Sequence, residues 1–451
     1  MVDRGRLAEL LQQEREQYAQ RNPLSGKAYA SAEHLFGRVP MTWMNMRAGA
    51  FPLYLDSARG AQVCDLDGHD YVDFSLGDTA AMAGHSPEPV VRAVQRRFGE
   101  LGGATAMLPT EDAEWVGAEL TRRFGLTRWS FALTATDANR WAIRIVRAVT
   151  GKPRILVNSY CYHGSVDESL IVVGPDGEAR SREGNVGAPY DVTQTSRVAE
   201  FNDLEGLERE LAHGDVAAVL MEPALTNIGI VLPQEGYLQG VRELTRRHDT
   251  LLINDETHTF SAGPGGATRA WGLDPDLLVI GKAIGGGIPA ASYGMSAEFA
   301  DRVLGRTDLD LVDMGGVGGT MAGSALSVAA MRATLEEVLT DAAFETMVAR
   351  AGEFAAGVRS VIAAHELPWS LSQLGARAEY RFPAQPPVNG TQSHDAHDAE
   401  LDDYLHIALA NLGVLMTPFH NMALMSPATT EADVDRHTAV LDETLAALAG
   451  A

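Results

Sequence analysis

Cysteine is nearly absent from this chain. Only Cys64 and Cys161 occur among its 451 residues, and neither belongs to a Cys-x-x-Cys motif. Two isolated cysteines exclude a disulfide scaffold and are typical of a reducing compartment. Basic residues are also few, with 36 Lys and Arg against 60 Asp and Glu, which gives a formal net charge of -24. Because nucleic acids and anionic membrane surfaces are polyanions, this charge argues against both as partners and favours small molecules.

Long hydrophobic runs are missing as well. No apolar stretch of the sequence approaches the length needed to cross a bilayer. The segment 1–21 is charged, carries Leu7, Leu10 and Leu11 at helical spacing, and lacks the continuous apolar core of a signal peptide. We therefore expect a cytoplasmic protein.

The length of the chain exceeds the usual limit of one hydrophobic core, so at least two domains are expected. Short aliphatic runs alternate with amphipathic segments over 76–318, which is typical of a mostly parallel sheet covered by helices. We predict a large α/β domain at 76–318 and a small α+β domain built from both ends of the chain, 1–75 and 319–451. The expected elements of the large domain are strands at 130–133, 155–158, 216–221, 250–254 and 277–280 and helices at 137–149 and 236–247.

The flanking segments show a different pattern. Residues 56–74 predict a hairpin around Asp67-Gly68, and residues 376–382 predict a strand. The stretch 383–398 is rich in Pro, Gly, His and Asp and is expected to be a loop. Its two histidines, His394 and His397, have no third ligand nearby, so no metal site is predicted.

One lysine stands in a position typical of a reactive amine. Lys282 follows the aliphatic run 277–280 and precedes the glycines at 285–287. Such a run predicts a strand buried on both faces, and open α/β sheets assemble their sites at the carboxyl ends of these strands. Burial favours the neutral form of an amine and frees its lone pair for Schiff-base chemistry. An ordinary surface lysine is the alternative.

Three further features belong with Lys282. Asp255 directly follows another expected strand, and a lysine Schiff base with a buried aspartate is what pyridoxal 5'-phosphate (PLP) chemistry requires. The segment 134–139 lies between a strand and a helix, where free backbone N–H groups and the helix dipole bind anions. Tyr162 follows a strand and offers a ring that can stack on a flat cofactor. The alternatives are a surface acid, an ordinary helix N-cap and a core tyrosine.

Together these elements resemble the class III aminotransferases, which are PLP enzymes of fold type I, and within them the branch of glutamate-1-semialdehyde 2,1-aminomutase. The motifs that carry the resemblance extend over most of the chain. They are Asp67-Gly68, Tyr71-Val72-Asp73, Gly84-His85-Ser86-Pro87, Pro109-Thr110-Glu111, Ala142-Ile143-Arg144, Cys161-Tyr162-His163-Gly164, Glu222-Pro223, Asp255-Glu256, Gly281-Lys282 and Gly319-Thr320. The resemblance implies the fold type I architecture and PLP as the cofactor.

The resemblance also implies roles for the matched residues. Lys282 would hold PLP as a Schiff base and then carry a proton between substrate and cofactor. Asp255 would pair with the ring nitrogen. Ala135, which stands in place of the family's glycine, and Thr136 would bind the phosphate, and Tyr162 would stack on the ring.

Three more matched positions complete the implied cofactor site. Glu222 would orient groups near the phenolic oxygen of the ring. Thr257 would pack against the ring in place of the usual apolar residue. Thr320 matches a threonine that serves the phosphate of the neighbouring subunit, so the resemblance implies a homodimer with shared active sites.

The substrate side departs from the family pattern. Asp78 stands where the aminomutase has a tryptophan, and an acid there would attract an amine, although a loop-capping aspartate is the alternative. Trp43 and Phe419 stand near positions where relatives that act on amino acids carry carboxylate-binding arginines. These three residues are the predicted substrate contacts, in a pocket suited to a bulky or aromatic group.

From these departures we predict an aminotransferase that moves an amino group between an amine or amino acid and a carbonyl acceptor through Lys282. The alternative is a PLP-dependent isomerase, either an aminomutase or a racemase, because both reactions begin at the same lysine and cofactor. A third hypothesis, a catalytically silent protein of the same fold, is disfavoured because Lys282, Asp255 and Thr320 are all present.

Overall fold

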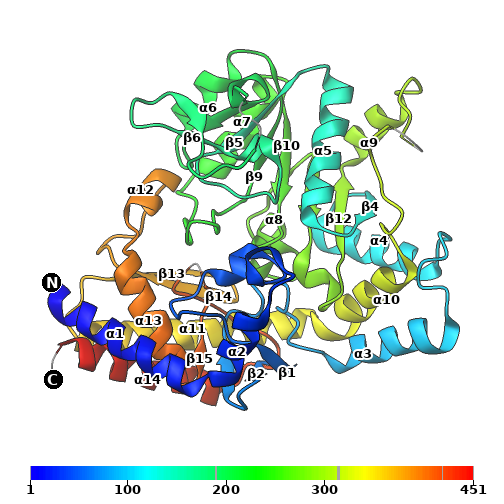
Figure 1. Ribbon diagram of the computed structural model, residues 1–451. Helices are drawn as coiled ribbons and strands as arrows, with labels where there is room; N and C mark the ends of the chain where they lie inside the picture. The colour runs from blue at the N-terminus through cyan, green and yellow to red at the C-terminus, as the bar shows by residue number, and fades with distance from the viewer. Residues whose placement is uncertain (1, 188–189, 312–314, 419, 450–451) are drawn as a thin grey trace. The chain divides into compact units, whose positions relative to one another are not determined.

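The computed structural model describes residues 2–187, 190–311, 315–418 and 420–449 (Figure 1). The chain forms two compact units. The first unit is Met1–Pro87, Glu345–Pro386 and Ala396–Ala451, and the second unit is Glu88–Phe344 and Pro387–Asp395. The predicted domain boundaries lie after residues 75 and 318, whereas the corresponding boundaries between the two units lie after residues 87 and 344. Both divisions assign the two ends of the chain to one part and its middle to the other.

The second unit is built on a seven-stranded sheet. Its strands lie in the order β4 (Arg128–Ala132), β12 (Ala291–Met295), β11 (Leu277–Ile280), β10 (Leu251–Asp255), β9 (Val216–Met221), β5 (Arg154–Asn158) and β8 (Ser196–Ala199). The strands from β11 to β8 are parallel, whereas β12 is antiparallel to both of its neighbours. Every residue of β9, β10 and β11 is buried, as expected for aliphatic strands covered on both faces. The predicted α/β class with a mostly parallel sheet is confirmed.

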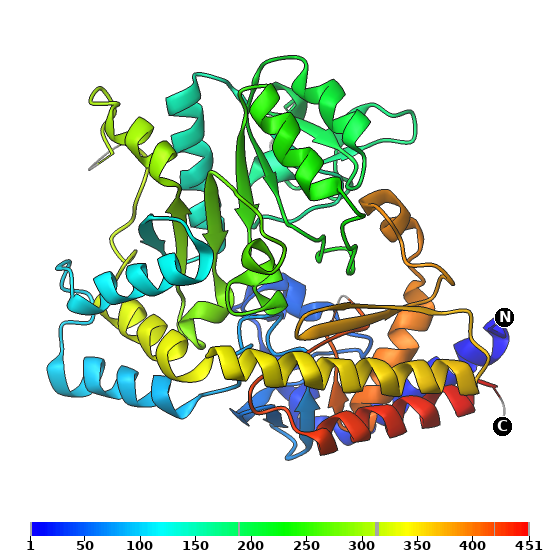
Figure 2. The ribbon, with the colours of Figure 1, turned by 180° about the vertical axis from the view of Figure 1, so that it is seen from behind.

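All five expected strands and both expected helices of this unit are present, with ends displaced by at most two residues. The helix α5 (Ala135–Thr150) packs on β11 and β12, and its buried residues include Trp141 and Ile145. The other helices of the unit are α3 (Glu88–Gln95), α4 (Glu111–Phe124), α6 (Leu204–Leu211), α7 (Tyr237–Arg247), α8 (Gly266–Ala270), α9 (Ala297–Leu304), α10 (Ala325–Ala333) and α12 (Gly390–Asp395). Of these, α6 and α7 lie side by side (Figure 2), and a small ribbon of β6 (Ile171–Val173) and β7 (Ala179–Ser181) accompanies them.

The first unit joins the two ends of the chain in one sheet. This sheet has the order β1 (Leu55–Arg59), β2 (Gln62–Asp65), β3 (Asp70–Asp73) and β15 (Val414–Leu415), and β15 runs parallel to β3. A second sheet consists of β13 (Ser370–Leu374), β14 (Arg377–Arg381) and β16 (Met422–Leu424). The helices are α1 (Arg4–Arg21), α2 (Pro23–Ser31), α13 (Ala399–Asn411), α14 (Glu431–Ala449) and most of α11 (Asp341–Ala364). Helices α1 and α13 pack side by side (Figure 1).

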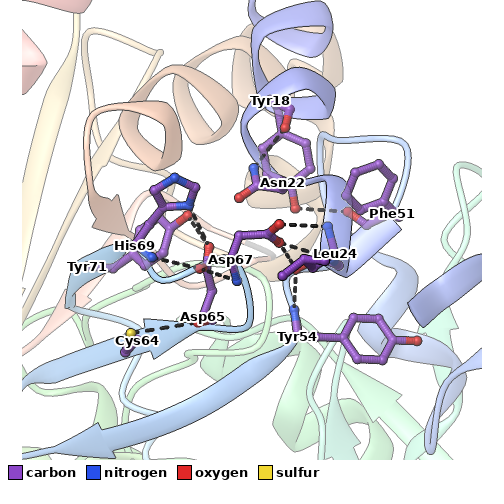
Figure 3. Close-up of polar contacts among 11 residues, drawn as sticks. Tyr18, Asn22, Leu24, Phe51, Tyr54, Cys64, Asp65, Asp67, His69 and Tyr71 are labelled. Atoms are coloured by element: carbon purple, nitrogen blue, oxygen red, sulfur yellow. Dashed lines mark hydrogen bonds and ion pairs between the residues drawn. The ribbon is translucent and has the colours of Figure 1, made fainter. Parts of the chain in front are cut away.

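The expected hairpin around Asp67-Gly68 is formed by β2 and β3, and its turn anchors the start of α2 (Figure 3). The Asp67 carboxylate accepts hydrogen bonds from the backbone N–H groups of Leu24, at 2.6 Å, and Ser25, at 2.9 Å. Asp65 accepts the Tyr71 hydroxyl at 2.7 Å from within the same hairpin. The carboxylates of Asp65 and Asp67 therefore stabilise a turn whose position the sequence pattern already predicts.

The stretch 383–398 is not entirely a loop, because it contains α12. Segments remote in sequence stabilise this short helix: the Ser393 hydroxyl donates to the carbonyl of Ile228, and the His394 ring stacks on Tyr160 at a centroid distance of 4.5 Å. The prediction is wrong at 390–395 because these contacts are tertiary. Within the described ranges, no helix is both long and apolar enough to cross a membrane.

Candidate functional site

Lys282 lies in a strained turn at the carboxyl end of β11. Its backbone has a φ of 50°, a left-handed conformation that costs a residue with a Cβ about 1–2 kcal/mol. The preceding residue, Gly281, allows this turn to approach the start of α5, since a Cβ on it would lie 3.0 Å from the Cβ and 3.2 Å from the backbone nitrogen of Ala135. The structure therefore brings Lys282 next to Ala135, and strain of this kind is typical of functional sites.

Asp255 ends β10, the strand beside β11, and is 3% exposed. The register pairs Asp255 with Val279, so Asp255 and Lys282 emerge at the same edge of the sheet. One carboxylate oxygen of Asp255 lies 2.9 Å from Nδ1 of His163 and accepts the side-chain amide of Asn139 at 2.8 Å. The other oxygen accepts the N–H group of Thr257 at 3.1 Å.

These contacts determine the charge of the pair. Burial acts to raise the pKa of Asp255, but the hydrogen bond and charge of His163 outweigh it and lower that pKa to about 2. Burial likewise acts to lower the pKa of His163, and the influence of Cys161 and Asp255 outweighs it and raises that pKa well above the ordinary value. Asp255 is therefore a buried anion near neutral pH, held by a protonated histidine.

The start of α5 forms an anion-binding corner. Thr134 caps the helix, with its Oγ1 accepting the N–H group of Asp137 at 3.1 Å. The first N–H groups of any helix lack partners within it, so those of Ala135 and Thr136 suit an anion. The Thr136 hydroxyl oxygen also accepts the N–H group of Ser165 at 3.2 Å, which leaves its own hydrogen for a ligand.

The Tyr162-His163-Gly164 segment lies against this corner. Gly164 has a φ of 81°, and a Cβ on it would lie 2.0 Å from Oγ1 of Thr136, so only glycine fits there. Tyr162 is 42% exposed, and its neighbour His163 contacts Asp255. The segment therefore links the anion-binding corner to the buried carboxylate.

The other predicted cofactor residues divide into two groups. Thr257 is buried and bonded to Asp255, and Glu222 directly follows β9, whose register with β10 places it at the same sheet edge. Glu222 also accepts a hydrogen bond from Thr226. Thr320 is exposed and also belongs to the second unit.

Two of the predicted substrate residues, Trp43 and Asp78, belong to the first unit. Trp43 is 44% exposed. Asp78 belongs to a run of positive φ values, 43°, 57°, 50° and 83° over residues 76–79, and the buried Arg377 holds this run by donating to the Thr79 hydroxyl at 2.8 Å. Phe419 lies outside the described residues.

Sequence reasoning missed His258. Its Nε2 lies 2.9 Å from Nζ of Lys282, which makes it the histidine in direct contact with the reactive amine. Two signals in the sequence point to this site: His258 stands three residues after Asp255, and Lys282 is one of only three lysines in the chain, with Lys27 and Lys152.

Comparisons with known proteins agree with this arrangement. Residues 43–445 match the family Aminotransferase class-III. The chain is 32% identical to the glutamate-1-semialdehyde 2,1-aminomutase of Anaeromyxobacter sp. (strain Fw109-5) over 92% of this chain and 96% of that protein.

Solved structures show the same likeness. A glutamate-1-semialdehyde-aminomutase from Pseudomonas aeruginosa PAO1 superimposes with a TM-score of 0.96 at 45% identity, covering 99% of each chain, and a second structure under that name is of a complex with PMP. An omega-transaminase from Sphaerobacter thermophilus follows with a TM-score of 0.86 at 28% identity, over 96% of this chain and all of that one.

These relatives correct one prediction and confirm others. The predicted aminotransferase activity is wrong, because the curated relatives at 32% identity and the solved structure at 45% identity are aminomutases, which are isomerases. The pocket for a bulky or aromatic group was part of the same functional prediction and is withdrawn with it. The predicted family, its aminomutase branch, the fold type I architecture and the PLP cofactor are confirmed.

Proposed function

Because the chain belongs to the class III aminotransferase family and uses PLP, we propose that it is an isomerase, an aminomutase acting on glutamate 1-semialdehyde or a close analogue. The observation that carries this proposal is the 45% identity, over 99% of both chains, to the Pseudomonas aeruginosa aminomutase. The substrate of such an enzyme holds an amine and a carbonyl on neighbouring carbons. The reaction exchanges the two groups, so it needs no second substrate.

The residues present fit the cofactor. The N–H groups at the start of α5 and the hydroxyl of Thr136 suit a phosphate, and the glycine at 164 keeps that corner open to close approach. The Asp255 carboxylate, with its pKa held at about 2, suits a protonated ring nitrogen. When bound, PLP supplies a conjugated ring that takes up electrons as a proton leaves the substrate carbon.

Each side chain then has a defined task in the proposal. Nζ of Lys282 would anchor the cofactor and carry a proton between substrate and cofactor, since the carbon that bears the amine loses a proton as it becomes a carbonyl and the other carbon gains one. Asp255 keeps the ring nitrogen protonated, and His163 keeps Asp255 charged and oriented. Ala135 and Thr136 hold the phosphate.

The remaining positions serve orientation. Tyr162 and Thr257 contact the ring, and Glu222 orients groups near its phenolic oxygen. We propose that Thr320 completes the phosphate site of a second copy, which makes a homodimer the working unit, and that this homodimer is cytoplasmic. Trp43, Asp78 and Phe419 are proposed to contact the substrate, where the Asp78 carboxylate attracts its amino group.

The test is a turnover count with one substrate. The protein is loaded with the amine form of the cofactor and given glutamate 1-semialdehyde without any amino acceptor or donor. An aminomutase accumulates many molecules of 5-amino-4-oxopentanoate per active site and releases little free diamine. The Lys282→Ala variant, which lacks the proton carrier, is the control and accumulates none beyond background.

The alternative hypothesis, an aminotransferase, predicts a different result. A transferase stops after one amino group per site and resumes only when a second substrate is added. That outcome, with a diamine product released in equal amount, would overturn the proposal.

A further inference from the structure

His258 and Lys282 form a pair of nitrogens at the edge of the sheet. His258 begins a short 3-10 turn, Thr259–Ala262, three residues beyond Asp255, and Lys282 begins the turn after the neighbouring strand. Their side-chain nitrogens, Nε2 and Nζ, are 2.9 Å apart, and both side chains are partly buried. None of the tasks assigned above uses His258.

The 2.9 Å distance between Nε2 of His258 and Nζ of Lys282 indicates a hydrogen bond, which limits how the two side chains share protons. A lysine ammonium only donates, and imidazole Nε2 accepts only when the ring is neutral. The contact is therefore compatible with one shared proton in either of two states: the ammonium donates to neutral imidazole, or imidazolium donates to neutral amine. The two states differ by the position of that proton alone.

Schiff-base formation by a lysine requires such a proton transfer. When Nζ forms a bond to a carbonyl carbon, its nitrogen becomes positively charged and has to lose a proton to a nearby base. Imidazole is suited to this because its ordinary pKa lies close to neutral pH.

The carboxylates beside the pair are poorly suited to the same task. Asp255 is committed to His163, Asn139 and Thr257, and its pKa of about 2 makes it too weak a base near neutral pH. Glu256 is fully buried and accepts the hydroxyl of Thr259 and two N–H groups at the start of α8.

We propose that His258 is the general base of Lys282. As the bond between Nζ and a carbonyl carbon forms, the π electron pair of the C=O bond moves to the oxygen, the Nζ–H bond breaks and an Nε2–H bond forms. His258 then passes the proton to that oxygen, which leaves as water, and it returns a proton to Nζ when the lysine is released. No oxidant or other reactant is needed. This inference rests on the proposed role of Lys282 in anchoring the cofactor.

The first test uses the cofactor-free protein and the scarcity of lysine. A small acylating reagent at limiting concentration labels Lys27, Lys152 and Lys282, and mass spectrometry follows each site separately. In the His258→Gln variant, the amide keeps a hydrogen bond to Nζ but takes up no proton. We expect labelling of Lys282 to slow about tenfold or more near neutral pH, while Lys27 and Lys152 keep their rates and serve as internal controls.

A second variant separates chemistry from structure. His258→Ala is expected to label Lys282 slowly and to recover speed when free imidazole is added, whereas a merely structural histidine gives no such rescue. The pH profile of the wild-type labelling rate should also contain an inflection from His258 that both variants lack. Equal Lys282 rates in wild type and His258→Gln, with no imidazole effect on His258→Ala, would overturn the inference.

Covalent cofactor uptake distinguishes this failure from failure of the proposed function. Uptake of PLP by the cofactor-free protein is followed by absorbance, with Lys282→Ala as the control. If Lys282→Ala still takes up PLP covalently, the assignment of Lys282 is wrong and the inference falls with it. If Lys282→Ala takes up none and His258→Gln does so at the wild-type rate, the inference alone is wrong.

Discussion

Replacing Gly164 by alanine tests the packing of the anion-binding corner. The new Cβ would lie 2.0 Å from Oγ1, 2.8 Å from Cβ and 2.9 Å from Cα of Thr136, so a side-chain rotation cannot relieve the clash and the first turn of α5 must move. Overpacking of this kind costs about 1–3 kcal/mol, and the positive φ of 81° adds about 1 kcal/mol for a residue with a Cβ. We expect the free energy of unfolding to fall by about 2–4 kcal/mol.

Gly151→Ala is the matched control, because Gly151 ends the same helix. The φ of Gly151 is 71°, and a Cβ at this position would meet no described atom within 4 Å. Gly151→Ala should therefore lower the free energy of unfolding only through the positive φ, by about 1 kcal/mol. Thermal unfolding of the cofactor-free protein compares the two variants, with about 1–2 °C in Tm for each kcal/mol in a chain of this length. PLP affinity, measured by titration, should fall in Gly164→Ala and stay unchanged in Gly151→Ala. Equal stability and equal affinity of the two variants would refute the close approach of residues 164 and 136.

Other predictions concern the buried acids and the phosphate corner. In Asp255→Asn, loss of the carboxylate should bring the pKa of His163 down toward its ordinary value, as an NMR titration of the histidine would report; an unmoved pKa would contradict the pairing. In the wild type, the pKa of Asp255 is about 2 in the folded state, against an ordinary value of 3.8. The carboxylate therefore contributes about 2 kcal/mol to the free energy of unfolding above pH 3.8, and this contribution is lost as the pH falls through about 2. Acid unfolding of Asp255→Asn should lack this component. Glu256→Gln replaces an acceptor of backbone N–H groups by an amide with one donor end and should lower the unfolding free energy by about 1–3 kcal/mol in denaturant titrations, an expectation that a neutral effect would refute. Thr136→Val should weaken PLP binding about tenfold while Thr136→Ser preserves it, and equal affinities would exclude the hydroxyl from the phosphate site.

The central strands could be predicted because burial on both faces demands aliphatic residues. β9, β10 and β11 are buried throughout; β9 and β11 are continuous apolar runs, and β10 begins with Leu251, Leu252 and Ile253. β12 was missed because its sequence Ala-Ser-Tyr-Gly-Met carries no such run. Residue 294 is a glycine because a Cβ at this position would lie 2.6 Å from the Trp129 ring. β8 was missed because Arg197 interrupts it, and this arginine is paired with Asp215 on a neighbouring segment.

The site was predicted only as far as strand ends determine it. Lys282 and Asp255 follow adjacent parallel strands, and the sheet register alone brings them to one edge. The contacts of His258 with Lys282 and of His163 with Asp255 depend on the geometry of turns, which residue patterns do not specify. The reaction was misassigned for a chemical reason: an aminomutase and an aminotransferase start from the same lysine and cofactor, so substitutions such as Asp78 in the loops do not distinguish them.

The central claim is that this site is assembled around Lys282, and the most direct measurement locates the cofactor on the chain. Borohydride reduction of the PLP-loaded protein fixes the cofactor to the lysine that bears it, and peptide mass mapping then identifies that lysine among the three in the sequence. We predict the pyridoxyl group on the peptide containing Lys282 and none on the peptides of Lys27 and Lys152. A pyridoxyl group on either of those two, or an unmodified Lys282 peptide, would contradict the account.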